Sequence, residues 1–298
     1  MEAAAAFAST WPSERRAVSV GAPATWSDLR ADDLAVVADS CPWADVFAAA
    51  REALRANAWV ALSAQRVGSL ADRFGVPSPG GSVLVLRPTP APSEYAIRWR
   101  DALVAGLSLV VVGPLLLVLA ALVRWRDGPP AFYRAQVVGH GGRRFHWYKL
   151  RSLRQAAKAA DVERAEAFRR FSTGERIGDA DDTKLVDPAR VTPVGAFLRR
   201  YSLDELPQVW NVIRGEMALV GPRPCLPYEY DVMADWQRER VGVRPGLTGL
   251  WQVFGRSRVG FEESMVLDQL YVMTRSWTLD LELIVRTVGV ILCGKGGR

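Results

Sequence analysis

The sequence predicts an α/β protein in three parts: a small soluble α/β domain over residues 1–90, a re-entrant membrane helix hairpin over 98–126, and a mostly helical domain with a short β-hairpin over 127–298. Three observations lead to this prediction. One stretch of 22 residues carries no charge, clusters of Pro and Gly separate the segments, and both helical and strand periods of hydrophobic residues occur. With 298 residues and 49% hydrophobic content, the chain can bury a substantial core.

The N-terminal part reads as helix over 43–58, helix over 63–74 and strand over 82–87. The Pro- and Gly-rich residues 77–81 and 88–93 form a turn and a linker, which puts the domain boundary near residue 90. None of these residues forms a catalytic motif, so the sequence assigns the N-terminal part no role.

The cysteines and the first residues indicate the compartment. Cys41, Cys225 and Cys293 stand far apart, which predicts neither a disulfide framework nor a zinc site and favours a reducing, cytoplasmic setting. Glu2 occupies a region where a signal peptide carries positive charge, so no cleaved signal is predicted.

The positive charge belongs to the second part of the chain. Residues 1–97 contain 8 Arg, no Lys and 10 acidic residues, whereas residues 98–298 contain 30 basic and 22 acidic residues. A basic surplus of this kind suits nucleic acid, an anionic membrane or a phosphorylated substrate. The neighbouring motifs must decide among them.

Residues 102–123 form the uncharged stretch, which as a helix would extend roughly 33 Å, enough to cross a bilayer. Gly113 and Pro114 lie at its middle, where proline predicts a kink or a break. Arg-Trp-Arg stands at both ends, at residues 98–100 and 124–126. Because a spanning helix normally has its positive charge at one end, these symmetric flanks favour a re-entrant hairpin over a spanning helix, and both over a buried core helix.

Two further elements follow. Residues 143–154 are basic and amphipathic and are expected to include a β-hairpin followed by a loop, and residues 156–171 are expected to be helical. An amphipathic helix is predicted over 277–293, with an apolar face for the core or for a membrane surface. His140 and His146 lack the spacing of a metal pair and receive no role.

Ser202-Leu-Asp-Glu205 is the most informative short motif. It has the form of a capping box, in which serine and glutamate bind backbone N–H groups at a helix start. Asp204 and Glu205 at such a position also suit phosphate chemistry, with one carboxylate as nucleophile and the other as a Mg²⁺ ligand. The two interpretations are compatible, and the spacing alone does not separate them.

The segments 187–224 and 244–256, together with Lys149-Leu-Arg-Ser152, resemble the bacterial sugar transferase family of monotopic polyprenyl-phosphate phosphoglycosyl transferases. The resemblance covers roughly residues 98–295, with the apolar segment in the family's place. Three departures stand out: Gly113 replaces the usual Ser before Pro114, Cys225 replaces a Glu, and Thr274-Arg275 replaces Asn-Trp.

The resemblance implies transfer of a sugar-1-phosphate from a UDP-sugar to polyprenyl (undecaprenyl) phosphate with release of UMP, at the cytoplasmic face of the membrane, as the first step of a polysaccharide or glycan. It implies Asp204 as the nucleophile that forms a phosphosugar-aspartyl intermediate and Glu205 as the ligand of Mg²⁺. Arg223, in Pro-Arg-Pro, is expected to bind phosphate, because flanking prolines restrict the backbone that aims it. Further candidate phosphate-binding residues are Lys149, Arg199, Arg200 and Arg256, and Asp268 is a candidate active-site acid.

Several alternatives stay open. The donor sugar is expected to be a hexose, with an N-acetylhexosamine type as the alternative, and a catalytically inactive membrane-anchored scaffold is the competing class. A nucleic-acid partner is not expected, because the apolar segment contradicts a simple basic nucleic-acid binder. The oligomeric state is open, a homodimer included.

Overall fold

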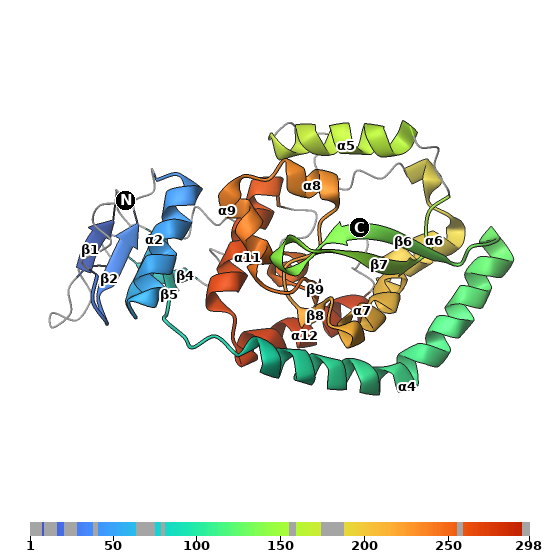
Figure 1. Cartoon of the computed structure of the whole chain (residues 1–298), viewed down its shortest axis with the longest axis horizontal. Coiled ribbons are helices and arrows are strands. Elements are labelled where there is room, and N and C mark those ends of the chain that lie inside the picture. The colour runs from blue at the N-terminus through green and yellow to red at the C-terminus, as the bar shows by residue number, and fades with distance from the viewer. Residues whose placement is uncertain are drawn as a thin grey trace.

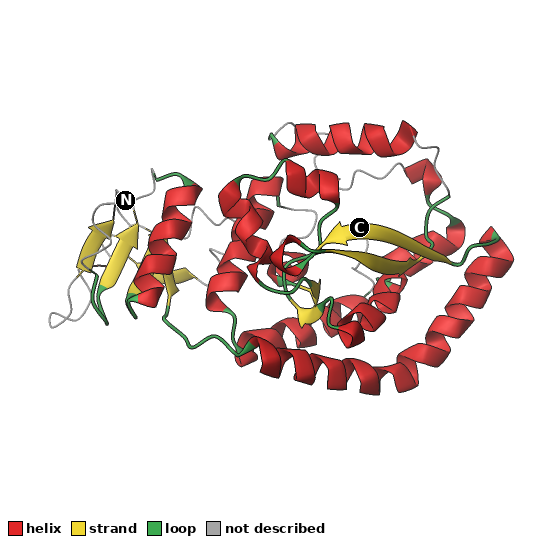
Figure 2. Ribbon diagram, in the orientation of Figure 1, coloured by secondary structure: helices red, strands yellow, loops and turns green. Residues whose placement is uncertain are grey.

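The computed structural model describes residues 8, 17–20, 29–37, 41–63, 75–78, 81–154, 159–173, 188–254 and 259–293. The protein is mostly helical with a few short strands (Figure 2). A sheet with one flanking helix occupies the N-terminal side, and a larger, mainly helical part carries the rest of the chain (Figure 1).

The N-terminal sheet has five strands in the order β1-β2-β3-β5-β4. Its first three strands run parallel and its last three are joined antiparallel. The elements are β1 (Ala17–Val20), β2 (Leu34–Val37), α2 (Trp43–Arg55), β3 (Trp59–Ser63), β4 (Gly75–Ser78) and β5 (Gly81–Leu86). The predicted helix over 43–58 and strand over 82–87 are confirmed within a few residues.

The helix predicted over 63–74 does not begin where expected. Ser63 is the last residue of β3, whose side chains are almost all buried, and residues 64–74 lie outside the described ranges. Trp59 to Leu62 are aromatic and aliphatic residues that suit a buried strand, and the sequence analysis overlooked this short apolar run because its length does not distinguish strand from helix.

Helix α2 packs against the larger part through aromatic rings. Phe47 is fully buried, and its ring stacks on Trp43 and on Trp236, each at a centroid distance of 5.4 Å. Trp236 belongs to α9 (Asp235–Arg238), and α2 also contacts α11 (Phe261–Thr274). One hydrophobic cluster therefore includes residues of both parts.

Helix α4 (Glu94–Asp127) contains the uncharged stretch, and it is the one described helix long and apolar enough to cross a membrane. Its N-cap is Ser93, whose side chain accepts a hydrogen bond of 3.1 Å from the backbone N–H of Ala96. Pro114 lies inside the helix, which bends along its length but is not divided in two (Figure 1). The sequence predicted either a kink or a break at this point, and the structure has a bend in one continuous helix.

Most apolar side chains of α4 face outward, including Trp99, Leu107, Val111 and Trp125. Helix α12 (Trp277–Leu292), which confirms the predicted helix over 277–293, continues this surface with exposed side chains at Trp277, Leu281, Val285, Val288 and Leu292. The two helices meet at Arg100, which lies 2.8 Å from Asp280 and over the ring of Trp277. Two helices thus present apolar side chains without a protein partner in the described chain.

A β-hairpin is present, but only its second strand lies in the stretch 143–154 where the hairpin was predicted, because two seven-residue strands need more residues than that stretch contains. Strand β6 (Phe132–Val138) pairs antiparallel with β7 (Arg144–Leu150), and the predicted helix over 156–171 is α5 (Ala159–Ser172). The remaining elements are short: η3 (His140–Gly142), η4 (Pro188–Arg190), α6 (Pro193–Arg200), η5 (Leu203–Gln208), α7 (Val209–Arg214), β8 (Ala218–Val220), α8 (Pro227–Asp231), η6 (Glu239–Gly242), β9 (Gly246–Thr248) and α10 (Leu250–Phe254).

Strands β8 and β9 run parallel and approach each other closely because glycines line the contact. A Cβ atom added at Gly221 would collide with the carbonyl oxygen of Arg244, and one at Gly246 would collide with the backbone nitrogen of Gly221. A Cβ atom at Gly249 would meet the carbonyl oxygen of Gly221. The chain that leads from β8 into Pro222-Arg223-Pro224 therefore has a fixed path.

Candidate active site

Asp204 and Glu205 lie in the first turn of η5, after a tight left-handed residue. Ser202 has φ 53°, and its side chain makes no capping hydrogen bond. Glu205 instead forms an ion pair of 2.7 Å with Lys149. The expected capping box is therefore wrong for this motif: the sequence that resembles a cap presents its carboxylates to cations.

Asp204 is largely buried, with 7% of its surface exposed. Burial raises the pKa of its carboxyl above the ordinary value of 3.8, and the negative charge of Glu205 raises it further. The positive charges of Lys149 and Arg199 lower the pKa and partly offset these effects. The site thus holds a carboxylate that is poorly hydrated and surrounded by cations.

Lys149 belongs to β7, the second strand of the hairpin. Trp147 and Lys149 are two residues apart and share a face of the strand, and the Lys149 ammonium lies 3.9 Å from the Trp147 ring centroid. The guanidinium of Arg223 lies 5.4 Å from the same ring. One buried aromatic ring therefore places the lysine of β7 beside the arginine that follows β8.

Asn211 fixes β7 against the helices. This fully buried residue of α7 donates a hydrogen bond of 2.7 Å to the carbonyl oxygen of His146 and accepts one of 3.4 Å from the backbone N–H of Tyr148. Its side chain also donates to Glu216 over 2.7 Å. The segment that carries Trp147 and Lys149 is consequently tied to the helix that follows the carboxylate pair.

A cleft of about 810 Å³ contains these groups. One region of its wall is charged and includes Asp204, Glu205, Lys149, Arg199 and Arg223. Another region is apolar, with side chains from β6, α10 and α12 such as Phe132, Trp251, Val290 and Ile291. The cleft therefore combines charged side chains with apolar ones, some of which belong to α12, the helix whose outer face is also apolar and exposed.

Two expected site residues do not line the cleft, and a third is not among the described residues. Arg200 does not line the cleft, and its guanidinium lies 5.6 Å from the ring centroid of its neighbour Tyr201. Asp268 does not line the cleft either: it is fully buried on α11 and pairs with Arg240 over 2.6 Å. Arg256 lies outside the described residues. Gly113 and Pro114, expected at the membrane break, lie inside α4.

Burial also shifts two carboxyls near Arg223. It raises the pKa of Asp268 to about 6, against the opposing effect of Arg240, and it raises the pKa of Glu229 against the effects of Arg223 and Arg240. Glu229 lies on α8, lines the cleft and accepts a hydrogen bond of 2.8 Å from the backbone N–H of Leu226.

The sequence analysis did not assign roles to Trp147, Glu229, Arg240 and Arg151. Arg151 donates hydrogen bonds to the carbonyl oxygens of Asp127, over 2.6 Å, of Pro129, over 2.8 Å, and of Gly128. It therefore satisfies carbonyl groups at the C-terminal end of α4 and ties the membrane helix to the end of β7. Arg151 and Trp147 could have been singled out from the sequence, because both lie within two residues of Lys149, which was predicted to bind phosphate.

The donor set fits a magnesium ion. Asp204 and Glu205 are adjacent carboxylates at a cleft, and Mg²⁺ is commonly held by one or two carboxylates together with water and substrate phosphates. Among the described residues no group of three or more His, Cys, Asp or Glu side chains is placed to hold a metal by protein ligands alone. These residues would thus hold Mg²⁺ together with a phosphorylated ligand.

Comparison with known proteins gives concordant matches. The family model described as bacterial sugar transferase matches residues 93–294. The exopolysaccharide production protein ExoY of Rhizobium meliloti is 36% identical over 228 residues, which cover 76% of this chain and 96% of that protein. The UDP-glucose:undecaprenyl-phosphate glucose-1-phosphate transferase of Caulobacter vibrioides is 34% identical over 239 residues, or 76% of this chain and 82% of that protein.

A third relative is longer. The undecaprenyl-phosphate galactose phosphotransferase of Salmonella typhimurium is 37% identical over 209 residues, which cover 68% of this chain but 42% of that protein. The shared region in all three comparisons includes the greater part of the chain described above.

Proposed function

The chain belongs to the bacterial sugar transferase family, and from this membership we propose that it transfers a sugar-1-phosphate from a UDP-sugar to polyprenyl phosphate. The observation that carries the proposal is the cleft in which the buried Asp204 lies among Lys149, Arg199 and Arg223. A carboxylate nucleophile is repelled by a phosphate, so nearby cations are needed to lower the barrier. The names of the relatives, two of which describe transfer to undecaprenyl phosphate, support the same reaction.

The proposed reaction has two displacements at one phosphorus atom. A carboxylate oxygen of Asp204 attacks the phosphorus that bears the sugar, and the bond to the bridging oxygen breaks so that UMP leaves with the electron pair. An oxygen of polyprenyl phosphate then attacks this phosphorus, and the bond to Asp204 breaks. The products are polyprenyl diphosphate sugar and a regenerated carboxylate.

Arg223, Lys149 and Arg199 would bind the phosphate oxygens during both displacements. Their charges offset the negative charge that gathers as donor and nucleophile approach, and the rigid turn around Arg223 avoids the cost of reorganisation. Mg²⁺, held by Glu205 with Asp204 nearby, would supply further charge neutralisation at the diphosphate. The ion pair with Lys149 would hold the Glu205 carboxylate beside the cations that bind the diphosphate.

The membrane location follows from the same geometry. Helix α4 and the exposed side of α12 would insert into the bilayer from the cytoplasmic face, with α4 re-entrant as the flanking Arg-Trp-Arg motifs suggest. The apolar region of the cleft adjoins α12, so a polyprenyl chain could reach the site while remaining in lipid. We propose a hexose donor and a role at the start of exopolysaccharide synthesis, in line with the relatives' names.

The test is UMP release from detergent-solubilised protein supplied with Mg²⁺, polyprenyl phosphate and one of a panel of UDP-hexoses and UDP-N-acetylhexosamines. We expect release with a hexose donor, and loss of release in Asp204→Asn. Without the lipid acceptor, sugar-labelled donor should leave an adduct on Asp204, located by peptide mapping. A label on another residue would contradict the assigned nucleophile, and no release with any donor would favour the scaffold alternative.

A further inference from the structure

The backbone of Arg223 accepts a hydrogen bond from a second arginine, Arg240, which also lines the cleft. One terminal nitrogen of Arg240, Nη2, donates a hydrogen bond of 2.7 Å to the carbonyl oxygen of Arg223. The same nitrogen lies 2.6 Å from Oδ2 of Asp268. One terminal nitrogen therefore takes part in both the hydrogen bond to Arg223 and the ion pair with Asp268.

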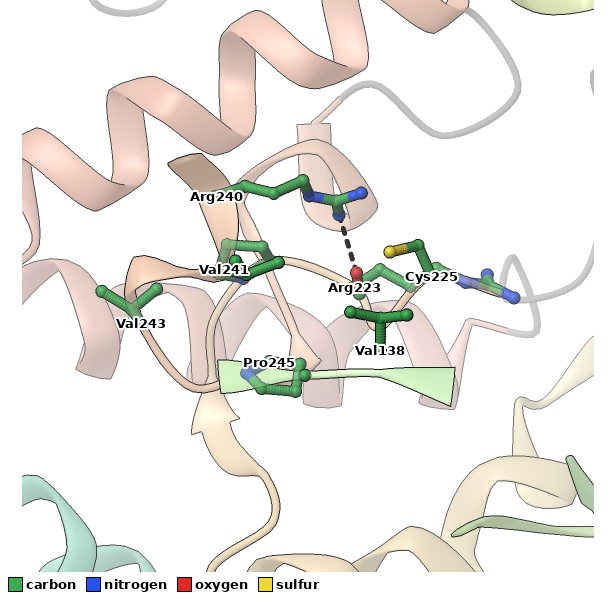
Figure 3. A pocket seen from close by; sticks show the side chains of 9 residues that line it. Val138, Arg223, Cys225, Arg240, Val241, Val243 and Pro245 are labelled. Carbon is green, nitrogen blue, oxygen red and sulfur yellow. Dashed lines mark hydrogen bonds between the residues drawn. The ribbon is translucent and has the colours of Figure 1, made fainter. Parts of the chain in front are cut away.

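The direction of these contacts is visible in Figure 3. The carbonyl oxygen of Arg223 points to Arg240, while the side chain of Arg223 leads away from that contact. The guanidinium of Arg223 lies over Trp147 at the cleft. The residue is thus fixed at its backbone on one side and presents its charge on the other.

Burial makes this pair of charges energetically costly. Arg240 is 4% exposed and Asp268 fully buried, so both charges have lost their hydration. A buried ion pair is a weak source of stability, because desolvation offsets the attraction between the charges. The pair does constrain geometry: Asp268 holds the guanidinium of Arg240 where one of its N–H groups reaches the carbonyl oxygen of Arg223.

The turn that receives this hydrogen bond is restrained from other sides too. Pro222 and Pro224 limit the backbone on either side of Arg223, and Gly221 packs against Gly246 without room for a side chain. Pro224 has a fixed φ and also restricts Arg223 to extended backbone conformations. The hydrogen bond from Arg240 adds a direct contact to the carbonyl group of Arg223 itself.

We propose that Arg240, oriented by Asp268, is a positioning residue that sets the direction in which Arg223 presents its guanidinium to the donor phosphates. The inference rests on the proposed function in that Arg223 acts on the UDP-sugar. It also gives Asp268 a role different from the expected active-site acid: the carboxylate acts through Arg240 and Arg223 and does not touch substrate.

A double-mutant cycle tests this inference, with kcat/KM for UMP release as the measured quantity. Arg223→Gln alone should lower kcat/KM by about 10²-fold or more, as removal of a preorganised donor does. Arg240→Gln alone should lower it by roughly tenfold. In the Arg223→Gln background, Arg240→Gln should have an effect of less than about twofold, because its target is already gone.

A purely structural role would give another pattern. If Arg240→Gln lowers kcat/KM by the same factor in both backgrounds, Arg240 does not act through Arg223 and the inference is overturned. Asp268→Asn should reproduce the effect of Arg240→Gln in the wild-type background and lose it in the Arg223→Gln background. If Arg240→Gln does not fold, Arg240→Lys replaces it in the cycle under the same criterion, since lysine keeps the charge but has a shorter reach.

Arg51→Gln is the matched control. Arg51 forms an ion pair with Glu239, the residue next to Arg240, but has no contact with the Arg223 turn among the hydrogen bonds of the described residues. Its substitution should leave kcat/KM within about twofold of wild type. Wild-type protein without activity toward any donor would count against the proposed function. An active wild type in which Arg240→Gln lowers kcat/KM by the same factor in both backgrounds would count against this inference alone.

Discussion

Asp204 carries its charge in a place that the fold makes unfavourable. Burial and the neighbouring Glu205 raise its pKa in the folded protein, so the folded state binds the proton more tightly than the unfolded state does. For an acid with a raised pKa, stability is lost as pH rises from the unfolded value through the folded value. At neutral pH the ionised carboxylate therefore reduces the free energy of unfolding.

Asp204→Asn should consequently inactivate the protein and raise its Tm at pH 7.5. For a chain of this size the increase is about 2–4 °C for each kcal/mol recovered. Thermal unfolding in one detergent, followed by fluorescence, measures it. Asp235→Asn is the control, because the Asp235 side chain is fully exposed and its loss should leave Tm unchanged. A lower Tm in Asp204→Asn would show that the cations more than compensate for the burial.

The same raised pKa predicts an acid limb in the rate. Asp204 must be ionised to attack phosphorus, so the first displacement should slow as pH falls through its raised pKa, above the range of an ordinary aspartate. The measurement is the single-turnover burst of UMP without polyprenyl phosphate, because a phosphate monoester itself titrates near pH 6.

Asp268 has a pKa raised to about 6 and could produce a limb of its own. The limb should persist in Asp268→Asn, where this titration is absent, although the rate is lower. A burst rate that stays constant down to pH 4 would contradict the assignment of Asp204 as a buried nucleophile.

The residues proposed to touch substrate were more predictable than those that hold them in place. Asp204, Glu205, Lys149 and Arg223 stand in motifs whose residue types signal phosphate chemistry, and the structure brings all four to one cleft. Arg240 and Asp268 are 28 positions apart in the sequence, and nothing local marks them as a pair. Such contacts depend on how the helices pack, which hydrophobic periodicity does not specify.

At the scale of elements, the sequence predicted α4, β7 and α12 because length, charge and hydrophobic period are local properties. The capping box is not formed: Ser202 has a left-handed backbone and makes no capping hydrogen bond, and Glu205 pairs with Lys149. A local rule was overridden by a residue from another strand. The bend in α4 was predictable from Pro114, but its unbroken form was not, since neighbouring backbone groups can compensate for the missing hydrogen bond.

The orientation of α4 can be tested with single cysteines. Tyr95→Cys and Trp125→Cys place thiols at the two ends of α4, at side chains 74% and 78% exposed. The background has Cys41 and Cys293 replaced by serine and keeps Cys225, which is buried. A re-entrant helix should react at both ends with a membrane-impermeant maleimide added to inside-out vesicles.

Val111→Cys is the matched control for the same experiment. This side chain is 74% exposed in the protein but lies mid-helix, so the bilayer should shield it from the reagent in intact vesicles and detergent should restore labelling. Reaction at one end from the inside of the membrane and at the other end only from the outside would show a spanning helix.

At the scale of the whole molecule, the shared aromatic cluster joins the N-terminal sheet and its helix to the larger part. The sequence predicted a boundary near residue 90 from composition and a helix over 43–58. It did not identify Trp236 as a partner of this helix, because a hydrophobic period indicates that a helix is buried but not what it packs against.

Phe47→Ala should lower the Tm of the whole protein in a single transition. Removal of a fully buried phenylalanine costs about 3–5 kcal/mol, and Phe47 lies between Trp43 and Trp236. Differential scanning calorimetry checks both the size and the number of transitions, with Val162→Ala, at a 71% exposed position on α5, as the control. Two transitions, of which the substitution moves one, would mean that the two parts unfold independently.

The glycines between β8 and β9 have a consequence for how this protein can vary. At Gly221, Gly246 and Gly249 a single methyl group would occupy space already filled by backbone atoms, so no neighbouring rotamer change could make room for it. Random mutagenesis should therefore tolerate alanine at most surface glycines and reject it at these three. Variants with altered donor preference should therefore come from substitutions at the side chains that line the cleft rather than at these glycines.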